Sequence, residues 1–224
     1  MLDDVEMHKL KAACLKLRKT SVQEEEEYVT RDPVLILMST VLSLNRRWYS
    51  HALPARQYFE REVYPSLAPK TLDGLGAFIL GAGSNRGDWC SVALALWGRR
   101  EWDKARMLSE LADYFVDWRQ KNIPAASEIE ALRKWASSTS KDDFLRKIKG
   151  LGPRAHEQLL WYVEGKQAVK FDRHVASFVN QAVGRTTTDE EAIQALRQIA
   201  SDLGIAATAL DARIWDCMQS RCKA

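Results

Sequence analysis

Apolar side chains recur at intervals of three and four residues along most of the chain, the spacing that gathers them on one face of an α-helix. The clearest example is the segment 102–118, whose apolar face is formed by Ala105, Leu108, Leu111, Ala112 and Phe115. No segment alternates apolar and polar residues over the length of a strand. The pattern therefore predicts an all-α protein.

Residues typical of helix ends divide this pattern into separate helices. Asp32 followed by Pro33 predicts an N-cap and a first-turn proline, ahead of an apolar helix over residues 34–44. Two pairs, Ser21 with Glu24 and Thr188 with Glu191, have the spacing of a capping box. Further helices are predicted over residues 127–137, 141–147, 153–163, 172–183, 188–204 and up to about 222. The glycines at 74, 76, 81, 83 and 87 predict short helices and loops before residue 102.

The composition narrows the class of protein. A hydrophobic fraction of 46% in 224 residues is enough for one large core or for two smaller lobes. The acidic N-terminus lacks the features of a signal peptide, and the apolar run 34–44 is too short to cross a bilayer. Four cysteines in this length do not indicate a disulfide scaffold. We therefore expect a reduced, cytoplasmic location and no membrane partner.

The distribution of charge is more informative than its total. Thirty-three basic against thirty acidic residues give a formal net charge of +3, too small by itself to indicate a polyanionic partner. Basic residues gather in three places, over residues 46–61, 141–154 and 166–173. One such cluster alone is typical of a solvated helix face. The middle cluster coincides with the most unusual backbone motif of the chain, which makes it a candidate for binding nucleic acid.

That motif is KGLGPRAHEQLL, which begins at Lys149 and places two glycines ahead of a helical pattern. Glycines permit a turn so tight that neighbouring backbone N–H groups point outward together, and Pro153 suits the first helical position. The N–H groups of Gly152 and Arg154, at the positive end of the helix, would then bind one DNA phosphate. Lys147, Lys149 and the Arg154 side chain would add salt-sensitive attraction. The alternative is a glycine-rich turn that binds nothing.

A longer segment, IKGLGPRAHEQLLWYVEGKQAVKFDRHVASFV, resembles the signature of the helix–hairpin–helix (HhH-GPD) DNA glycosylase superfamily. That signature pairs a hairpin of the form L-P-G-V-G with a downstream V-D-x-H-V. The matching positions here are residues 148–152, which include Gly150 and Gly152, and residues 171–175, which include Asp172. The resemblance is carried by the coupled motif, because either half alone would be a weak match.

The resemblance implies a two-lobed helical fold with an active-site cleft between the lobes. One lobe would span residues 30–165 and end in the helix–hairpin–helix at about 141–163. The other would combine residues 1–29 with 166–224 and carry the catalytic aspartate. The implied reaction is hydrolysis of an N-glycosidic bond, after the base has left the double helix.

By the same resemblance, Asp172 is the catalytic carboxylate. Breaking the C1′–N bond builds oxocarbenium character on the sugar, and a carboxylate can stabilise that charge and orient water. The sequence also allows a plainer interpretation, because aspartate is a favoured N-cap and a helical pattern follows it. The two roles are compatible, since a cap fixes the carboxylate at the start of a helix.

Other site residues follow from the resemblance. The wedge that fills the space of the extruded base would be Asn45, with Arg46 and Arg47 contacting phosphate or the orphaned base, although asparagine is also a common helix C-cap. Arg173 and His174 would contact DNA beside the aspartate. The candidates for the base pocket are Trp48, Trp89 and His156, the last of which is equally compatible with a core or surface histidine.

The sequence departs from the family in two respects. Bifunctional members carry a nucleophilic lysine where this chain has Arg154, and a guanidinium cannot form a Schiff base. A monofunctional enzyme is therefore expected, with a displaced Lys149 or Lys170 as the alternative. Some members hold a four-cysteine iron–sulfur cluster, whereas here only Cys217 and Cys222 lie near the C-terminus.

The resemblance also bears on cofactors. We expect no iron–sulfur cluster and no required cofactor. In some members of the family the hairpin carbonyls bind a monovalent cation, and the matching carbonyls here belong to Arg146, Ile148 and Leu151. A structural Na⁺ or K⁺ ion is therefore expected to bind at these three carbonyls.

The expected function is that of a monomeric, monofunctional DNA glycosylase. It would remove a damaged, mismatched or modified base from double-stranded DNA, leave an abasic site, and associate with the nucleoid when acting. The base itself stays open, and a hypermodified cytosine of phage DNA would make the enzyme antiviral rather than a repair protein. A non-catalytic helix–hairpin–helix DNA-binding protein, or a helical module with no nucleic-acid role, would also fit the pattern.

Overall fold

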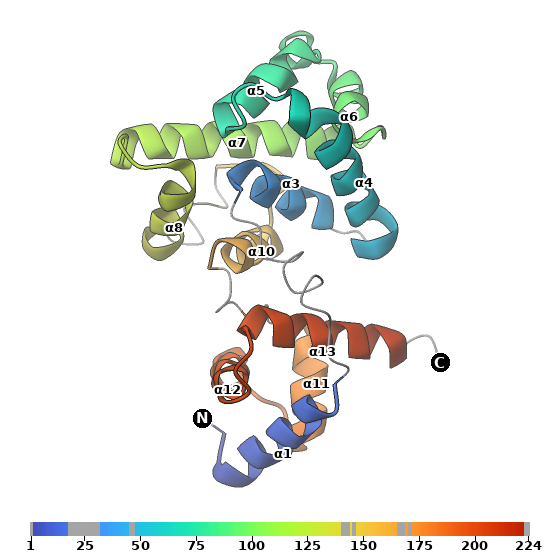
Figure 1. The fold of residues 1–224 in the computed structure, drawn as a ribbon, viewed down its shortest axis with the longest axis vertical. Helices are drawn as coiled ribbons and strands as arrows, with labels where there is room; N and C mark the ends of the chain where they lie inside the picture. Colours follow the sequence, from blue (N-terminus) through green and yellow to red (C-terminus); the bar gives the residue numbers. More distant parts are fainter. Residues whose placement is uncertain are drawn as a thin grey trace. The chain divides into compact units, whose positions relative to one another are not determined.

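The computed structural model describes residues 2–17, 32–44, 48–139, 144, 147–164, 169 and 172–221. Every regular element within these ranges is helical and none is a strand, which confirms the all-α class (Figure 1). The predicted capping box of Ser21 and Glu24 lies outside the described residues, as does most of the helix predicted over 141–147.

The chain packs as two compact units. Unit 1 consists of Met1–Val29 and Glu164–Ala224, and unit 2 consists of Thr30–Val163. The divisions predicted from the sequence lie between residues 29 and 30 and between residues 165 and 166. Each unit has a hydrophobic core of its own.

Unit 2 is organised around the long helix α7. Its helices are α3 (Pro33–Ser43), α4 (Leu53–Tyr58), α5 (Leu72–Gly81), α6 (Trp89–Trp97), α7 (Trp102–Asn122), α8 (Glu128–Ser138) and α10 (Pro153–Glu164). Helices α3, α5, α6 and α8 all contact α7 directly. Helices α5 and α6 lie along one side of α7, and α3 lies along the other (Figure 1). The apolar face predicted for α7 is buried, because Ala105, Leu108 and Leu111 are each 0% exposed.

The start of α3 follows the predicted capping pattern. The Asp32 side chain accepts a hydrogen bond from the backbone N–H of Leu35 at 3.1 Å, and Pro33 occupies the first helical position. The helix then buries most of its side chains. At its other end, the buried ammonium of Lys104 on α7 donates to the carbonyl oxygen of Leu42 at 2.8 Å, which satisfies one of the carbonyls left open at a helix C-terminus.

The stretch that contains the glycines does divide into short helices and loops, as predicted: α5, a single 3₁₀ turn at Ser84–Arg86, and α6. Gly74 and Gly76, however, lie inside α5 and do not break it. Thr71 caps this helix, and a β-carbon at Gly74 would lie 1.8 Å from the carbonyl oxygen of Pro69. Gly74 therefore allows close backbone packing, which outweighs its poor helix propensity. Gly83 and Gly87 do mark a break, since both have positive φ.

Unit 1 brings an N-terminal helix together with three C-terminal helices: α1 (Asp4–Leu15), α11 (Arg173–Val183), α12 (Asp189–Asp202) and α13 (Ala207–Arg221). Both α1 and α13 pack on α11 (Figure 1). The shared core contains Leu10, Val179, Ile199 and Ile214, all 0% exposed. The first helix of the chain therefore shares one core with the three helices of residues 173–221.

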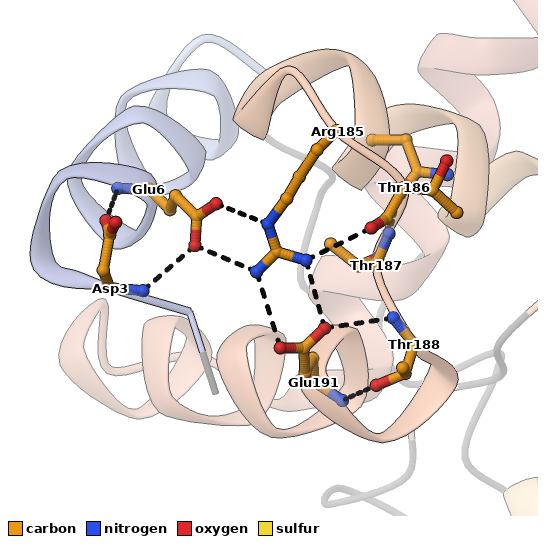
Figure 2. A network of polar contacts seen from close by, with 8 residues as sticks. Asp3, Glu6, Arg185, Thr186, Thr187, Thr188 and Glu191 are labelled. Carbon is orange, nitrogen blue, oxygen red and sulfur yellow. Dashed lines mark hydrogen bonds and ion pairs between the residues drawn. The ribbon is translucent and has the colours of Figure 1, made fainter.

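A polar network fastens α1 to the start of α12 (Figure 2). The Arg185 guanidinium donates from Nε to Glu6 Oε1 at 2.6 Å and from Nη1 to Glu191 Oε2 at 3.3 Å. Glu6 and Glu191 each also complete a capping box, with Asp3 and Thr188 respectively. The capping box predicted at Thr188 is thus confirmed, and its glutamate has a second partner that the local pattern did not indicate.

Candidate functional site

Asp172 caps helix α11. Its Oδ1 accepts hydrogen bonds from the backbone N–H groups of His174 at 2.8 Å and Val175 at 3.1 Å. This confirms the capping interpretation of the residue. Neither of these two bonds uses Oδ2, and the side chain is only partly buried. The carboxylate is therefore held by one oxygen at a fixed place on the surface of unit 1.

The two residues after Asp172 differ in exposure. Arg173 is exposed, and its Nε lies 3.5 Å from His174 Nε2. His174 is partly buried, with its ring 6.4 Å from the ring of Trp215 on α13. The start of α11 thus carries an acid, an exposed guanidinium and an imidazole within three consecutive residues, beside a tryptophan.

The glycine hairpin has buried apolar anchors and an exposed polar rim. Ile148 and Leu151 are 2% and 4% exposed, whereas Lys147, Lys149 and the two hairpin glycines are exposed. The turn is closed by a hydrogen bond from Leu151 N–H to the Ile148 carbonyl, 3.3 Å between nitrogen and oxygen. The helix that follows is α10, which begins at Pro153 as the sequence predicted. This arrangement presents backbone and basic side chains to solvent, as a phosphate-binding hairpin requires.

The two hairpin glycines are not equivalent. Gly150 has φ of +99°, a region that L side chains rarely adopt, and a β-carbon there would lie 3.2 Å from Met107 Sδ. A β-carbon at Gly152 would meet nothing within 4 Å. The turn therefore depends on Gly150, while the space in front of Gly152 is open.

Helix α7 contacts the back of this hairpin. Arg106 donates from Nη2 to the carbonyl oxygen of Lys149 at 3.0 Å, and from Nη1 to Glu110 Oε1 at 2.5 Å. Sequence reasoning missed Arg106, because a bond across 43 residues leaves no mark in the local pattern. Only its position on the polar face of α7, one residue from the buried Met107, would have drawn attention to it.

His156 is a core residue of unit 2. It is 6% exposed, and its ring lies 5.6 Å from that of Trp135 and 5.5 Å from that of Phe144. The helical face that His156 occupies points into the core, which confirms its interpretation as a core histidine. Its assignment to the base pocket stays a prediction.

The remaining sequence candidates are scattered or lie outside the described residues. Trp89 begins α6 and is partly buried, remote in the chain from the hairpin. Asn45, Arg46, Arg47 and Arg146 lie outside the described residues, as do the side chains of Trp48 and Arg154. The carbonyls of Ile148 and Leu151 stand one on each side of the turn, and that of Ile148 already accepts one hydrogen bond. A carbonyl oxygen has two lone pairs, so this one keeps the capacity to bind a cation.

Three of the four cysteines are described, and they do not form a ligand set. Cys14 is buried in unit 1, where burial raises the pKa of its thiol to about 12. Cys217 packs against the same core, and Cys90 is exposed on α6 of unit 2. Among the described residues, no three side chains of the histidine, cysteine or acidic types are grouped to hold a metal ion.

Glu128 is a further, partly buried acid, outside the predicted site. Both of its carboxylate oxygens accept from the backbone N–H of Leu72, at 2.9 and 3.1 Å, so it caps α5 from the neighbouring helix α8. Burial raises the pKa of this carboxyl above its ordinary value, against the opposing effects of the Leu72 N–H and Arg119. This geometry assigns Glu128 to the packing of unit 2.

The structure thus defines a helical protein in which a glycine hairpin precedes, in the chain, an aspartate that caps a helix. Residues 98–219 match the family model described as Domain of unknown function (DUF8548), more than half of the chain, and the protein belongs to this family. The matched range contains both the hairpin and Asp172. No curated protein and no solved structure matches the chain. Among the described residues, no helix has the length and apolar character needed to cross a membrane.

Proposed function

We propose that this protein is a monofunctional DNA glycosylase. It hydrolyses the N-glycosidic bond of a base extruded from double-stranded DNA and leaves an abasic site. The observation that carries the proposal is the carboxylate of Asp172, fixed by two backbone N–H groups at the position that the signature gives to the catalytic acid. A glycine hairpin with an exposed basic rim precedes it in the chain, which supports DNA as the substrate.

The fixed carboxylate of Asp172 suits the proposed role of stabilising positive charge on the sugar. As the C1′–N bond breaks, its electron pair leaves with the base, which takes up a proton, and positive charge develops on the sugar. An anionic oxygen held in place stabilises that charge without having to reorganise. The same carboxylate can orient the water that adds to C1′. Since Oδ1 is occupied by the cap, Oδ2 is the oxygen we assign to this role.

The hairpin is proposed to bind one phosphate of the DNA backbone. The N–H groups around Gly152 and Arg154 would donate to it at the start of α10, with Lys147 and Lys149 adding electrostatic attraction. Such contacts position the protein on DNA without reading sequence. The proposal includes the two-lobed glycosylase fold with its cleft, action as a cytoplasmic monomer, and a monovalent cation at the hairpin carbonyls.

The test is release of free bases from a panel of duplex DNAs carrying alkylated, deaminated, oxidised, mismatched or phage-type modified bases, read by mass spectrometry. We expect release from at least one substrate by the wild type and release about 10²–10⁴-fold slower by the Asp172→Asn variant, with DNA binding retained by both. Binding without release by the wild type on every substrate would favour the non-catalytic DNA-binding alternative. Binding that is weak and independent of salt would favour a helical module with no nucleic-acid role.

Borohydride trapping tests whether the enzyme is monofunctional or also forms a Schiff base with the sugar, as a bifunctional enzyme does. Because Arg154 cannot form a Schiff base, we expect no covalent protein–DNA adduct. An adduct that disappears in the Lys149→Ala or Lys170→Ala variant would identify a displaced lysine and a bifunctional enzyme instead.

A further inference from the structure

Arg106 joins two features of unit 2 that are remote in the chain. Its guanidinium donates through Nη2 to the Lys149 carbonyl at 3.0 Å and through Nη1 to Glu110 at 2.5 Å. The ion pair with Glu110 lies along α7 itself, one turn further on, and fixes the side-chain rotamer. The other terminal nitrogen of the planar guanidinium, Nη2, is thereby directed toward the hairpin backbone.

The bond to the Lys149 carbonyl also determines which way the next N–H points. The peptide between Lys149 and Gly150 is trans, so its carbonyl and its N–H point in opposite directions. Since Arg106 draws the carbonyl toward α7, the N–H of Gly150 is turned away from α7, on the exposed side of the hairpin. Arg106, whose side chain is partly exposed, therefore acts on the orientation of a hairpin donor through the carbonyl that it binds.

Met107 of α7 limits the space beside Gly150 in the same turn. Its Sδ lies so close to Gly150 that a β-carbon there would be 3.2 Å away, and the Met107 side chain is 7% exposed. Two consecutive residues of α7 thus hold two consecutive residues of the hairpin. Arg106 forms a hydrogen bond with Lys149, and Met107 packs against Gly150.

From these contacts we propose that Arg106 is a positioning residue for phosphate binding: it holds the 149–150 peptide so that the Gly150 N–H joins those of Gly152 and Arg154 as a donor to the phosphate. The proposal rests on the proposed function, because it assumes that the hairpin binds DNA. It assigns no contact with DNA to Arg106. The expected consequence is that loss of Arg106 weakens DNA binding through disorder of the hairpin rather than through loss of a surface charge.

Two measurements on Arg106→Ala test this. In the absence of DNA, hydrogen exchange of the Leu151 amide, which closes the turn onto Ile148, should accelerate at least tenfold. Because a disordered hairpin no longer holds Lys149 against its phosphate, affinity in DNA titrations should fall about threefold to tenfold and the salt slope by about 0.9. Unchanged exchange of the Leu151 amide, or accelerated exchange with unchanged affinity and slope, would overturn the inference.

Two control variants separate positioning from charge and from helix stability. Lys121→Ala removes the same charge and the same kind of ion pair from the other end of α7, where Lys121 binds Asp117 at 2.7 Å. Glu110→Gln removes the charge of the Arg106–Glu110 ion pair but keeps an amide oxygen that can accept from Arg106 Nη1, so the direction of Nη2 toward Lys149 should persist. Both variants should retain slow Leu151 exchange and a slope near that of the wild type, and a loss equal to that of Arg106→Ala in either would refute the positioning role. Salt-independent binding by the wild type would refute the proposed function and with it this inference, whereas the exchange measurement needs no DNA.

Discussion

Asp172 combines two properties that substitutions can separate. Asparagine is as good an N-cap as aspartate but carries no charge, whereas alanine provides neither. We expect Asp172→Asn to keep the stability of the wild type within about 0.5 kcal/mol. Asp172→Ala should lose roughly 0.5–2 kcal/mol with the two hydrogen bonds to α11. Urea unfolding of unit 1, followed by far-UV circular dichroism, measures this difference.

The same pair of variants tests the chemistry. Both should reduce single-turnover base release by about 10²–10⁴-fold, because both lack the charge that we propose to stabilise the developing oxocarbenium. If release fell only in Asp172→Ala and in proportion to its stability, Asp172 would be a cap and nothing more.

The hairpin glycines offer a second contrast at single residues. Gly150→Ala should cost about 1–2 kcal/mol, since it forces a side chain into the left-handed region and toward Met107. Gly152→Ala should leave stability within about 0.5 kcal/mol, because its β-carbon meets open space. That methyl group would nevertheless stand where the proposed phosphate approaches, so we expect DNA affinity to fall. Thermal unfolding and DNA titration of both variants check this, and equal destabilisation by the two substitutions would contradict it.

At the residue scale, the sequence predicted what local geometry determines. The caps at Asp32, Asp172 and Thr188 depend on residues two or three positions away, and all three form. The burial of His156 and the bond from Arg106 to the hairpin depend on helices distant in the chain, so no local pattern carries them. The candidate site was thus predictable in its residue types, and not in the contacts that hold it.

Among the elements, α1 and α12 are joined by charge as well as by packing, which makes their contact dependent on pH. The Arg185 guanidinium, followed by backbone hydrogen bonds, lowers the pKa of Glu6 below 4.5 and that of Glu191 to about 2. The unfolded chain therefore binds more protons than the folded chain as the pH falls. The stabilisation is complete above about pH 4.5 and declines toward pH 2.

We accordingly expect Arg185→Gln to lower the melting temperature of the protein at pH 6, and the difference from the wild type to shrink progressively between pH 4.5 and pH 2.5. Arg61→Gln is the matched control, because Arg61 pairs with Glu62 at the surface of unit 2 and joins no two helices. A constant difference across this pH range would show that Arg185 contributes by packing its side chain and not by its charge.

Element boundaries followed the sequence where caps are strong and departed from it where packing decides. Helix α7 extends to Asn122, beyond the periodic segment, and polar contacts accompany its last turn: Lys121 pairs with Asp117, and Asn122 Nδ2 donates to the Trp118 carbonyl. Helix α5 runs through two glycines, since Thr71 caps its start and Gly74 must pass close to Pro69. Helix propensity predicted a break there, and tertiary packing outweighed it.

On the scale of the whole molecule, a net charge of +3 is too small to draw the protein to DNA, so any strong binding must come from a local arrangement of charge. Substitution of two lysines can distinguish attraction by the overall charge from binding by a local cluster. Lys149 is exposed on the hairpin, and Lys121 is exposed near the end of α7. Each substitution to alanine changes the net charge by the same amount. Attraction by overall charge would make the two variants equivalent, whereas a hairpin that binds phosphate would not.

We expect Lys149→Ala to reduce the slope of log K against log salt by about 0.9 and the affinity for duplex DNA by about threefold to tenfold. Lys121→Ala should leave both within error of the wild type. Fluorescence anisotropy of a labelled duplex from 50 to 200 mM salt provides the measurement. Because a phosphate contact carries no sequence information, the loss in Lys149→Ala should be the same on unmodified and base-modified duplexes. A loss confined to modified duplexes would move Lys149 from the phosphate to the base, and the proposed division between a hairpin that grips the backbone and an aspartate that acts on the sugar would fail.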